Sequence, residues 1–218
     1  TYVELTPTVQ STNTTANTPL TVMLMRGQIY NMLANSLSDD MSGTQVRSVN
    51  GPQGQPCKPI AVFSGTSRTR LGSSGDFAMQ QIFPAQAWGT RYLSAPASSL
   101  SSTATRNPTP YRIFVRDPST VVRVNGAPLG IGGLIRNTYY EVAAISTITQ
   151  PITIEADKPI SVAQYFPSQG STGWVGNGDP ETIILSPIEQ AINSVGFMAT
   201  ENESMTGNFV QVIARVPN

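Results

Sequence analysis

The segment Lys158-Pro-Ile-Ser-Val-Ala-Gln-Tyr-Phe166 places a proline directly before a run of apolar and β-branched residues. Proline fixes φ and offers no N–H to a strand ladder, so it suits the start of a strand. β-Branched and aromatic residues then favour the extended, pleated backbone of a sheet. The segment therefore predicts a strand over Ile160–Phe166.

Similar short runs recur along the whole chain and are bounded by Gly, Pro, Asn and Ser. The pair Asn125-Gly126, which follows one of them, favours a type I′ hairpin turn. The expected strands are Leu20–Met25, Ile29–Leu33, Gln45–Val49, Ile60–Ser64, Met79–Phe83, Tyr92–Ala95, Tyr111–Arg116, Thr120–Val124, Tyr139–Ala143, Ile152–Glu155, Ile160–Phe166, Thr182–Leu185, Val195–Thr200 and Phe209–Val216, with a further strand pattern at the amino terminus. The fold class predicted from this pattern is all-β and antiparallel.

One short helix is expected near residues 187–193. Ser186 is a suitable N-cap, Pro187 fits the first helical position, and Glu189 completes a capping box. No other segment carries a comparable helix signal.

An internal repeat is the most informative pattern in the chain. Its two lysines both stand in Lys-Pro-Ile, and five landmarks recur in the same order at an offset of 100 to 110 residues. They predict a duplication, with a first β unit over residues 1–110 and a second over 111–218, each sandwich-like and packed against the other. The two units form either separate domains or one compact domain. The landmarks are Arg26-x-x-x-Tyr30 and Arg136-x-x-x-Tyr140, Lys58 and Lys158, Val62 and Val162, Asp76 and Asp179, and Pro84 and Pro187.

The composition excludes several classes of function. The net charge is zero with 12% charged residues, and no basic run suggests nucleic acid or an anionic membrane as a partner. No apolar run is long enough to span a bilayer. The absence of histidine removes Ser/His and Cys/His catalysis and histidine metal sites. Cys57, the single cysteine, is either a small hydrophobe or pairs with a cysteine outside the chain.

Several blocks in order carry a family resemblance: Lys58–Gly65, Gln81–Pro96, Tyr111–Val115, Glu155–Tyr165 and Gly178–Gln190. Over roughly Arg26 to Val216 the chain resembles the bacterial branch of the IgGFc-binding protein N-terminal domain family. The resemblance implies a β-rich module of large secreted surface proteins that is associated with adhesion. It does not imply immunoglobulin binding, because that label comes from a multidomain animal relative.

The expected function is therefore non-catalytic adhesion or ligand binding within a larger cell-surface protein, of which this chain is a fragment. The alternative is a structural module that self-associates into a stalk or filament. A carbohydrate-active enzyme would need two carboxylates across a cleft, and no spacing here pairs them. The expected partners are an extracellular protein or glycan and neighbouring domains of the same polypeptide, without nucleic acid or membrane insertion. No cofactor or metal is expected, although Asp39-Asp40 and the loops at Asp157 and Asp179 leave a Ca²⁺ site open.

Aromatic residues are the ligand-binding candidates. Trp174 lies in Gly170-Ser-Thr-Gly-Trp-Val-Gly-Asn-Gly178, a loop that offers little to bury an indole, and Tyr165-Phe166 end the preceding strand. An exposed indole offers a stacking face to a sugar ring or an anchor to a protein. Trp174, Tyr165 and Phe166 are the predicted site.

Overall fold

One long strand organises the fold. The structure is a computed structural model that describes residues 1–96, 98–99, 102–142, 150–176, 178–196 and 210–214. Strand β14 (Ile152–Phe166) has 15 residues, and its first half pairs antiparallel with β6 (Gly89–Ser94) and β10 (Val122–Val124). Its second half pairs with β9 (Tyr111–Val115) and β15 (Glu181–Ile184). Four strands therefore share β14 as their partner.

The register of β14 shifts between Glu155 and Ile160. Pro159 lies in this irregular stretch, where its missing N–H removes no regular ladder bond. The two strands expected on either side of Lys158 are thus one bent strand.

Shorter strands extend the main sheet on both sides. Strand β13 (Tyr139–Val142) pairs with β9 and with β12 (Leu134–Ile135), while β11 (Ala127–Pro128) pairs with β10. Asn125 and Gly126 both have positive φ, at 49° and 79°, between the paired residues Val124 and Ala127. Positive φ at both central residues is the requirement of a type I′ turn, so the predicted hairpin is confirmed.

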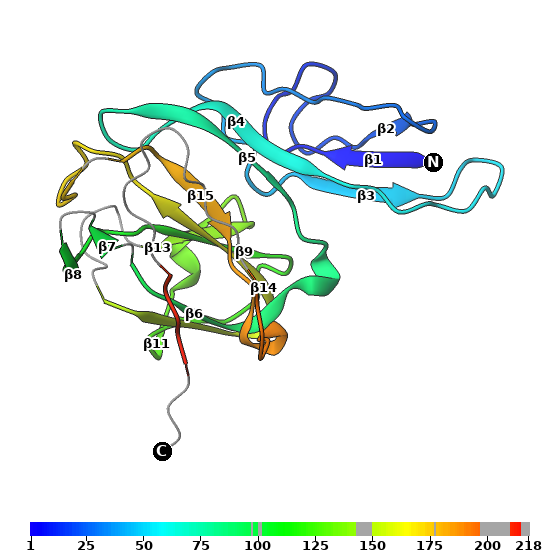
Figure 1. Ribbon diagram of the computed structural model, residues 1–218. Coiled ribbons are helices and arrows are strands. Elements are labelled where there is room, and N and C mark those ends of the chain that lie inside the picture. The colour runs from blue at the N-terminus through cyan, green and yellow to red at the C-terminus, as the bar shows by residue number, and fades with distance from the viewer. Residues whose placement is uncertain (97, 100–101, 143–149, 177, 197–209, 215–218) are drawn as a thin grey trace.

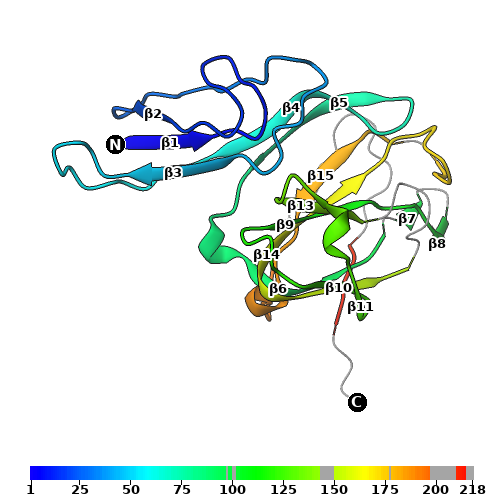
Figure 2. The same cartoon turned by 180° about the vertical axis from the view of Figure 1, so that it is seen from behind.

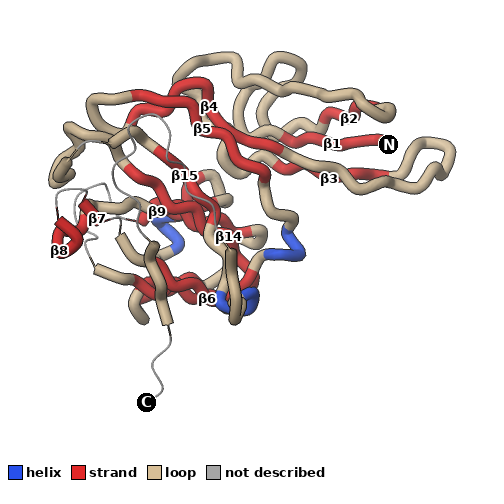
Figure 3. The backbone as a smooth tube through the Cα atoms, in the orientation of Figure 1, coloured by secondary structure: helices blue, strands red, loops and turns tan. Residues whose placement is uncertain are grey.

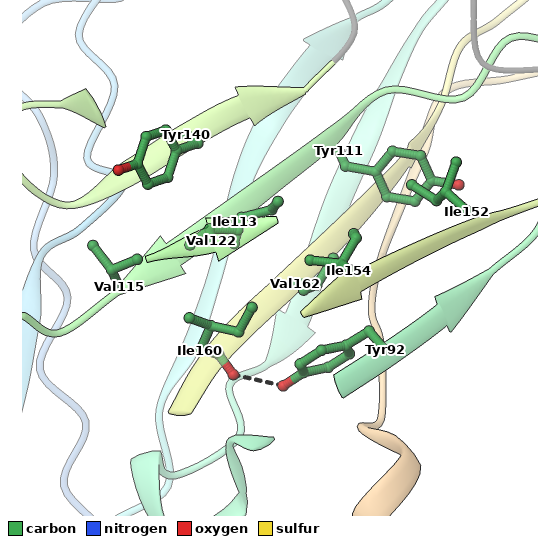
Figure 4. Close-up of a cluster of buried hydrophobic side chains, with 10 residues drawn as sticks. All are labelled: Tyr92, Tyr111, Ile113, Val115, Val122, Tyr140, Ile152, Ile154, Ile160 and Val162. Atoms are coloured by element: carbon green, nitrogen blue, oxygen red, sulfur yellow. Dashed lines mark hydrogen bonds between the residues drawn. The ribbon is translucent and has the colours of Figure 1, made fainter. Parts of the chain in front are cut away.

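The core lies on the inner face of this sheet (Figure 4). Buried and half-buried residues alternate along β9, as period-two side-chain packing requires. The Tyr92 hydroxyl donates to the Ile160 carbonyl at 2.5 Å and accepts from the Gly89 N–H at 3.2 Å. The buried cluster consists of Tyr92, Tyr111, Ile113, Val115, Val122, Tyr140, Ile152, Ile154, Ile160 and Val162.

A second, smaller sheet forms at the amino terminus (Figure 1 and Figure 2). Strand β1 (Tyr2–Thr6) is its centre, between β2 (Leu20–Met23) and β3 (Gln45–Val49). Val3 and Leu5 are buried on one of its faces. Neither residue belongs to the buried cluster of the main sheet.

A two-stranded ribbon lies between the two sheets in both views (Figure 1 and Figure 2). It consists of β4 (Phe63–Arg70) and β5 (Gly75–Gln81). The remaining elements are the strand pair β7 (Ser98–Ser99) and β8 (Ser102–Arg106), and the 3₁₀ turns η1 (Ala85–Ala87), η2 (Ile131–Gly133) and η3 (Ile188–Gln190), which are the only helical elements in the described part of the chain (Figure 3). The all-β prediction is confirmed.

Three local predictions differ from the structure. Ile29–Leu33 forms no strand, and Ile29 is 85% exposed, because no neighbouring strand pairs with this apolar run. The strand expected from Ile60 begins only at Phe63. Val195–Thr200 lies mostly outside the described residues, whereas residues 210–214 of the strand expected over Phe209–Val216 are described and form no strand.

The helix near residue 187 is a single 3₁₀ turn without a side-chain cap, so the capping box is wrong. Glu189 instead accepts hydrogen bonds from the backbone N–H and the hydroxyl of Thr90 on β6, at 3.2 and 2.7 Å. The Glu189 carboxylate, which the capping box would need, is therefore used in a tertiary contact with Thr90.

The two halves of the chain are joined by strand pairing, because β6 from residues 1–110 pairs with β14 from residues 111–218. Lys58-Pro-Ile60 lies outside the strands, whereas Lys158-Pro-Ile160 lies within β14. The duplication stays a prediction, and its measurement is a superposition of Arg26–Pro96 on the described residues of Arg136–Thr200.

Two core tyrosines make a matched test of the hydrogen bond to Ile160. Tyr92→Phe should lower the free energy of unfolding by about 1–3 kcal/mol, because a buried acceptor loses its donor. Among the described residues the buried hydroxyl of Tyr140 has no hydrogen-bond partner, so Tyr140→Phe should cost less than about 0.5 kcal/mol. Urea denaturation followed by circular dichroism measures both, and equal losses would contradict this assignment.

Candidate functional site

Trp174 is half-buried in its loop rather than exposed. Its indole Nε1 is shielded from solvent and has no hydrogen-bond partner among the described residues. A Cβ added at Gly178 would lie 3.1 Å from the indole Cζ2, so the small residue lets the ring pack against its own loop. The indole therefore has less free surface than the loop composition predicts.

Hydrogen bonds join this loop and the residues beside it to the tip of the β4–β5 ribbon, and we call this set of contacts the clasp. Ser168 is fully buried, and its N–H donates to the Leu71 carbonyl at 2.6 Å. The hydroxyl of Ser73 donates to the Gln169 carbonyl at 2.7 Å, and that of Ser74 donates to Asp179 Oδ1 at 2.6 Å. The clasp fixes the free end of the ribbon to the main sheet.

Tyr165 lies in a different environment. The Arg112 guanidinium carbon is 5.6 Å from the centre of its ring and 5.0 Å from that of Tyr139. Burial raises the pKa of the Tyr165 hydroxyl. Phe166 is half-buried at the end of β14, opposite Glu181. In the described part of the chain, no hydrogen bond or ring contact joins Trp174 to Tyr165 or Phe166.

Arg112 joins the amino-terminal region to the main sheet. Its Nη1 donates to Asp40 Oδ2 at 2.6 Å and to Ser42 Oγ at 2.9 Å, and its Nη2 lies 2.7 Å from Glu141 Oε1. Burial opposes the charge of Arg112, but attraction to Tyr165 and Asp40 outweighs it and raises the pKa of the guanidinium. With two carboxylates and two rings around it, this cation is satisfied within the fold.

Asp40 is stabilised as a carboxylate by the same contacts. Burial opposes its ionisation, but hydrogen bonds from Ser42 and the Arg112 guanidinium outweigh burial and lower the pKa of the Asp40 carboxyl. The backbone N–H of Ser42 donates to Asp40 Oδ1 at 2.8 Å. The Asp40 carboxylate, which the sequence left open for a Ca²⁺ site, thus serves as an ion-pair partner.

The other carboxylates considered for Ca²⁺ also have protein partners. Asp157 Oδ1 accepts from the Val121 N–H at 2.9 Å, and Asp179 accepts from Ser74. Within the described ranges, no three His, Cys, Asp or Glu side chains come together as metal ligands. No described helix is long and apolar enough to cross a bilayer.

An apolar face on the ribbon was not predicted from the sequence. Phe63, Phe77 and Met79 are 57–59% exposed, and we call them the ribbon face. The opposite face packs inward, since Ala78 is buried and Gln80 Oε1 accepts from the Ile184 N–H at 2.9 Å. The alternation of side chains along β5 predicts one exposed and one buried face. Because both faces carry apolar residues, it does not predict which face is exposed.

A groove with four charged residues in its lining crosses three strands of the main sheet. It has a volume of about 540 Å³. Its walls come from β6, β10 and β14 and from the residues beside them. They are Thr90, Arg91, Val121, Arg123, Glu155, Ala156 and Asp157.

Comparison with known proteins gives one result. The family model described as "IgGFc binding protein" matches residues 1–218. No curated protein and no solved structure matches the chain.

Acid unfolding tests the Arg112–Asp40 pair. Because the folded-state pKa of Asp40 is depressed, its stabilisation is present above the unfolded pKa and is lost as the pH falls from about 5 to about 2. Asp40→Asn should lower the free energy of unfolding at pH 7 by about 1–3 kcal/mol and flatten this acid dependence. Asp39→Asn is the control, and an equal effect of both variants in pH-resolved thermal unfolding would contradict the assignment.

The packing of Trp174 has a separate test. Trp174→Ala should lower the free energy of unfolding by about 1–3 kcal/mol, less than the ~3–5 kcal/mol of a fully buried aromatic. Denaturant unfolding measures this change. A loss within about 0.5 kcal/mol would instead mark a surface ring and favour Trp174 as a ligand residue.

Proposed function

We propose that this chain, which belongs to the IgGFc-binding protein family, is a non-catalytic adhesion module that binds an extracellular protein through the ribbon face. The observation that carries the proposal is the family match over residues 1–218. Members of the family are secreted or surface proteins, and the family is a binding family without enzymatic activity. The proposal includes that the chain comes from a bacterial surface protein and that its role there is adhesion.

The chemistry of the ribbon face supports a protein partner. Met79 lies opposite Gly65 and diagonal to Phe63, and Phe77 stands two residues before Met79 on the same face of β5. Opposed and diagonal side chains on one sheet face lie within contact range. Two aromatic rings and a methionine side by side in water are residue types enriched in protein interfaces. The partner surface should therefore present apolar side chains that cover them.

The ribbon is also held rigidly for binding. Its tip is fixed by Ser73 and Ser74, and Gln80 fixes its inner face to β15. A surface ordered before association loses less conformational entropy on binding. This favours the ribbon face over a loop that would have to be ordered by its partner.

Self-association is the second candidate function. In the described part of the fold β4 pairs with β5 alone, so its other edge carries backbone groups without strand partners. Such an edge can accept a strand from another chain. Arg68 and Arg70 discourage this at one end of β4, while Phe63 and Gly65 leave the other end uncharged. A second copy at this end would build a stalk or filament.

Adhesion should depend on the ribbon face. Beads that carry the chain should be retained on a surface coated with IgG Fc or with immunoglobulin-depleted serum proteins. Phe77→Ser should reduce retention at least about tenfold, because it removes an interface aromatic. Because Phe77 is exposed, the melting temperature of the Phe77→Ser variant should stay close to that of the unchanged chain.

Ile131→Ser is the matched control, because Ile131 is an exposed apolar residue of η2 outside the ribbon face. Retention on neither surface, or an equal loss with both variants, would overturn the proposal. Concentration-dependent oligomers that disappear with Phe77→Ser would replace it with the structural function.

A further inference from the structure

The groove contains a row of alternating charges set by strand register. Glu155 of β14 lies opposite Arg91 of β6 on one side and opposite Arg123 of β10 on the other. Directly opposed residues of antiparallel strands project from the same face, with Cβ atoms about 4.5–5.5 Å apart. All three side chains are exposed, so the row faces solvent.

The hydrogen-bonding capacity of this row is largely unused. Within the described residues, Arg123 and Glu155 take part in no ion pair and no side-chain hydrogen bond. The ion pair of Arg91 is a long one, with 3.8 Å between its Nε and Glu189 Oε1. Arg112, by contrast, has close partners on every side. The groove therefore presents the Arg123 guanidinium, which no described residue binds, beside an Arg91 whose ion pair is long.

The groove walls are held in place. The Val121 N–H donates to Asp157 Oδ1, and the Asp157 N–H donates back to the Val121 carbonyl at 3.2 Å. The Thr90 hydroxyl is fixed by Glu189. The volume of about 540 Å³ lies within the roughly 300–1,000 Å³ of small-ligand sites. A ligand of sugar size can enter without rearranging the strands.

The lining selects the chemistry of the ligand. Guanidinium groups bind carboxylates through paired N–H donors, and free carboxylates such as Glu155 accept hydroxyl groups. The acidic side chains beside the two arginines repel a polyanion, so they disfavour the binding of nucleic acid. Val121 and Ala156 are the apolar members of the lining and are too small to form the deep pocket of a protein anchor. A hydroxyl-rich molecule with an isolated carboxylate fits best.

We propose that the groove between β6, β10 and β14 binds an acidic sugar, with Arg123 and Arg91 on its carboxylate and Glu155 on its hydroxyl groups. The carboxylate belongs to a sialic acid or a uronic acid at the exposed end of a glycan. This site shares no residue with the ribbon face, so it can fail without affecting the proposed function. It gives the module a second, hydrophilic contact.

Titration calorimetry with sialyllactose, a hyaluronan tetrasaccharide and neutral lactose tests the proposal. One or both acidic sugars should bind saturably, at least about tenfold more tightly than lactose, because the guanidinium–carboxylate contact is charge-assisted. Which one binds identifies the source of the carboxylate. Arg123→Gln should weaken this binding about tenfold or more.

Arg116→Gln is the matched control, since Arg116 is an exposed arginine outside the groove and its replacement changes the net charge equally. Phe77→Ser should leave sugar binding unchanged, and Arg123→Gln should leave bead adhesion to the same protein surfaces unchanged once their glycans have been removed enzymatically. Glu155→Gln keeps a hydroxyl acceptor and should not weaken binding of the acidic sugar, whereas it would weaken binding of a basic peptide.

The proposal is overturned if no acidic sugar binds up to about 10 mM, a concentration that would detect even very weak ligands. It is also overturned if lactose binds equally well, or if Arg116→Gln is as harmful as Arg123→Gln. Binding of a lysine-rich peptide that Glu155→Gln abolishes would assign the groove to a protein partner instead.

Discussion

The fold depends on the hydrogen-bonding demand of β14. A strand of 15 residues presents N–H and C=O groups on both edges, and buried backbone groups must be paired. β6 and β10 satisfy its first half, and β9 and β15 satisfy its second half. The register shift after Glu155 lets one strand serve both sets. Each proposed surface follows from this arrangement: Glu155 enters the groove from the first half, and β15 supports the ribbon from the second.

The few charges of the chain are used in two distinct ways. With 12% charged residues, each ion pair stands out from a neutral polar surface. Arg112 is enclosed by Asp40, Glu141 and two tyrosine rings, so its charge holds the amino-terminal region to the main sheet. Removing either charge of such a pair leaves the other incompletely compensated. Arg123 has no such partner among the described residues. Arg112 is therefore a structural cation, whereas Arg123 is available to a ligand.

Local signals predicted the parts of the fold that local physics decides. Gln45–Val49 and the Asn125-Gly126 turn follow from β propensity and positive φ, and both agree with the structure. Ile29–Leu33 failed because apolar content alone does not supply a pairing partner. Trp174 was predicted to be exposed from the composition of its loop, but Gly178 leaves room for the ring to pack. That packing is decided by shape rather than by hydropathy.

The two proposed surfaces could not be predicted from the sequence, because the register of strand pairing brings their residues together. Arg91, Glu155 and Arg123 belong to three strands that lie far apart in the sequence, and only their pairing brings the three charges into one row. The surfaces also differ in physics: salt screens an exposed guanidinium–carboxylate contact but not apolar burial at the ribbon face. Two weak contacts of different kinds on one rigid module act at a high effective concentration once the first has formed. An adhesive module built this way holds to a surface that presents both protein and glycan more firmly than to either alone.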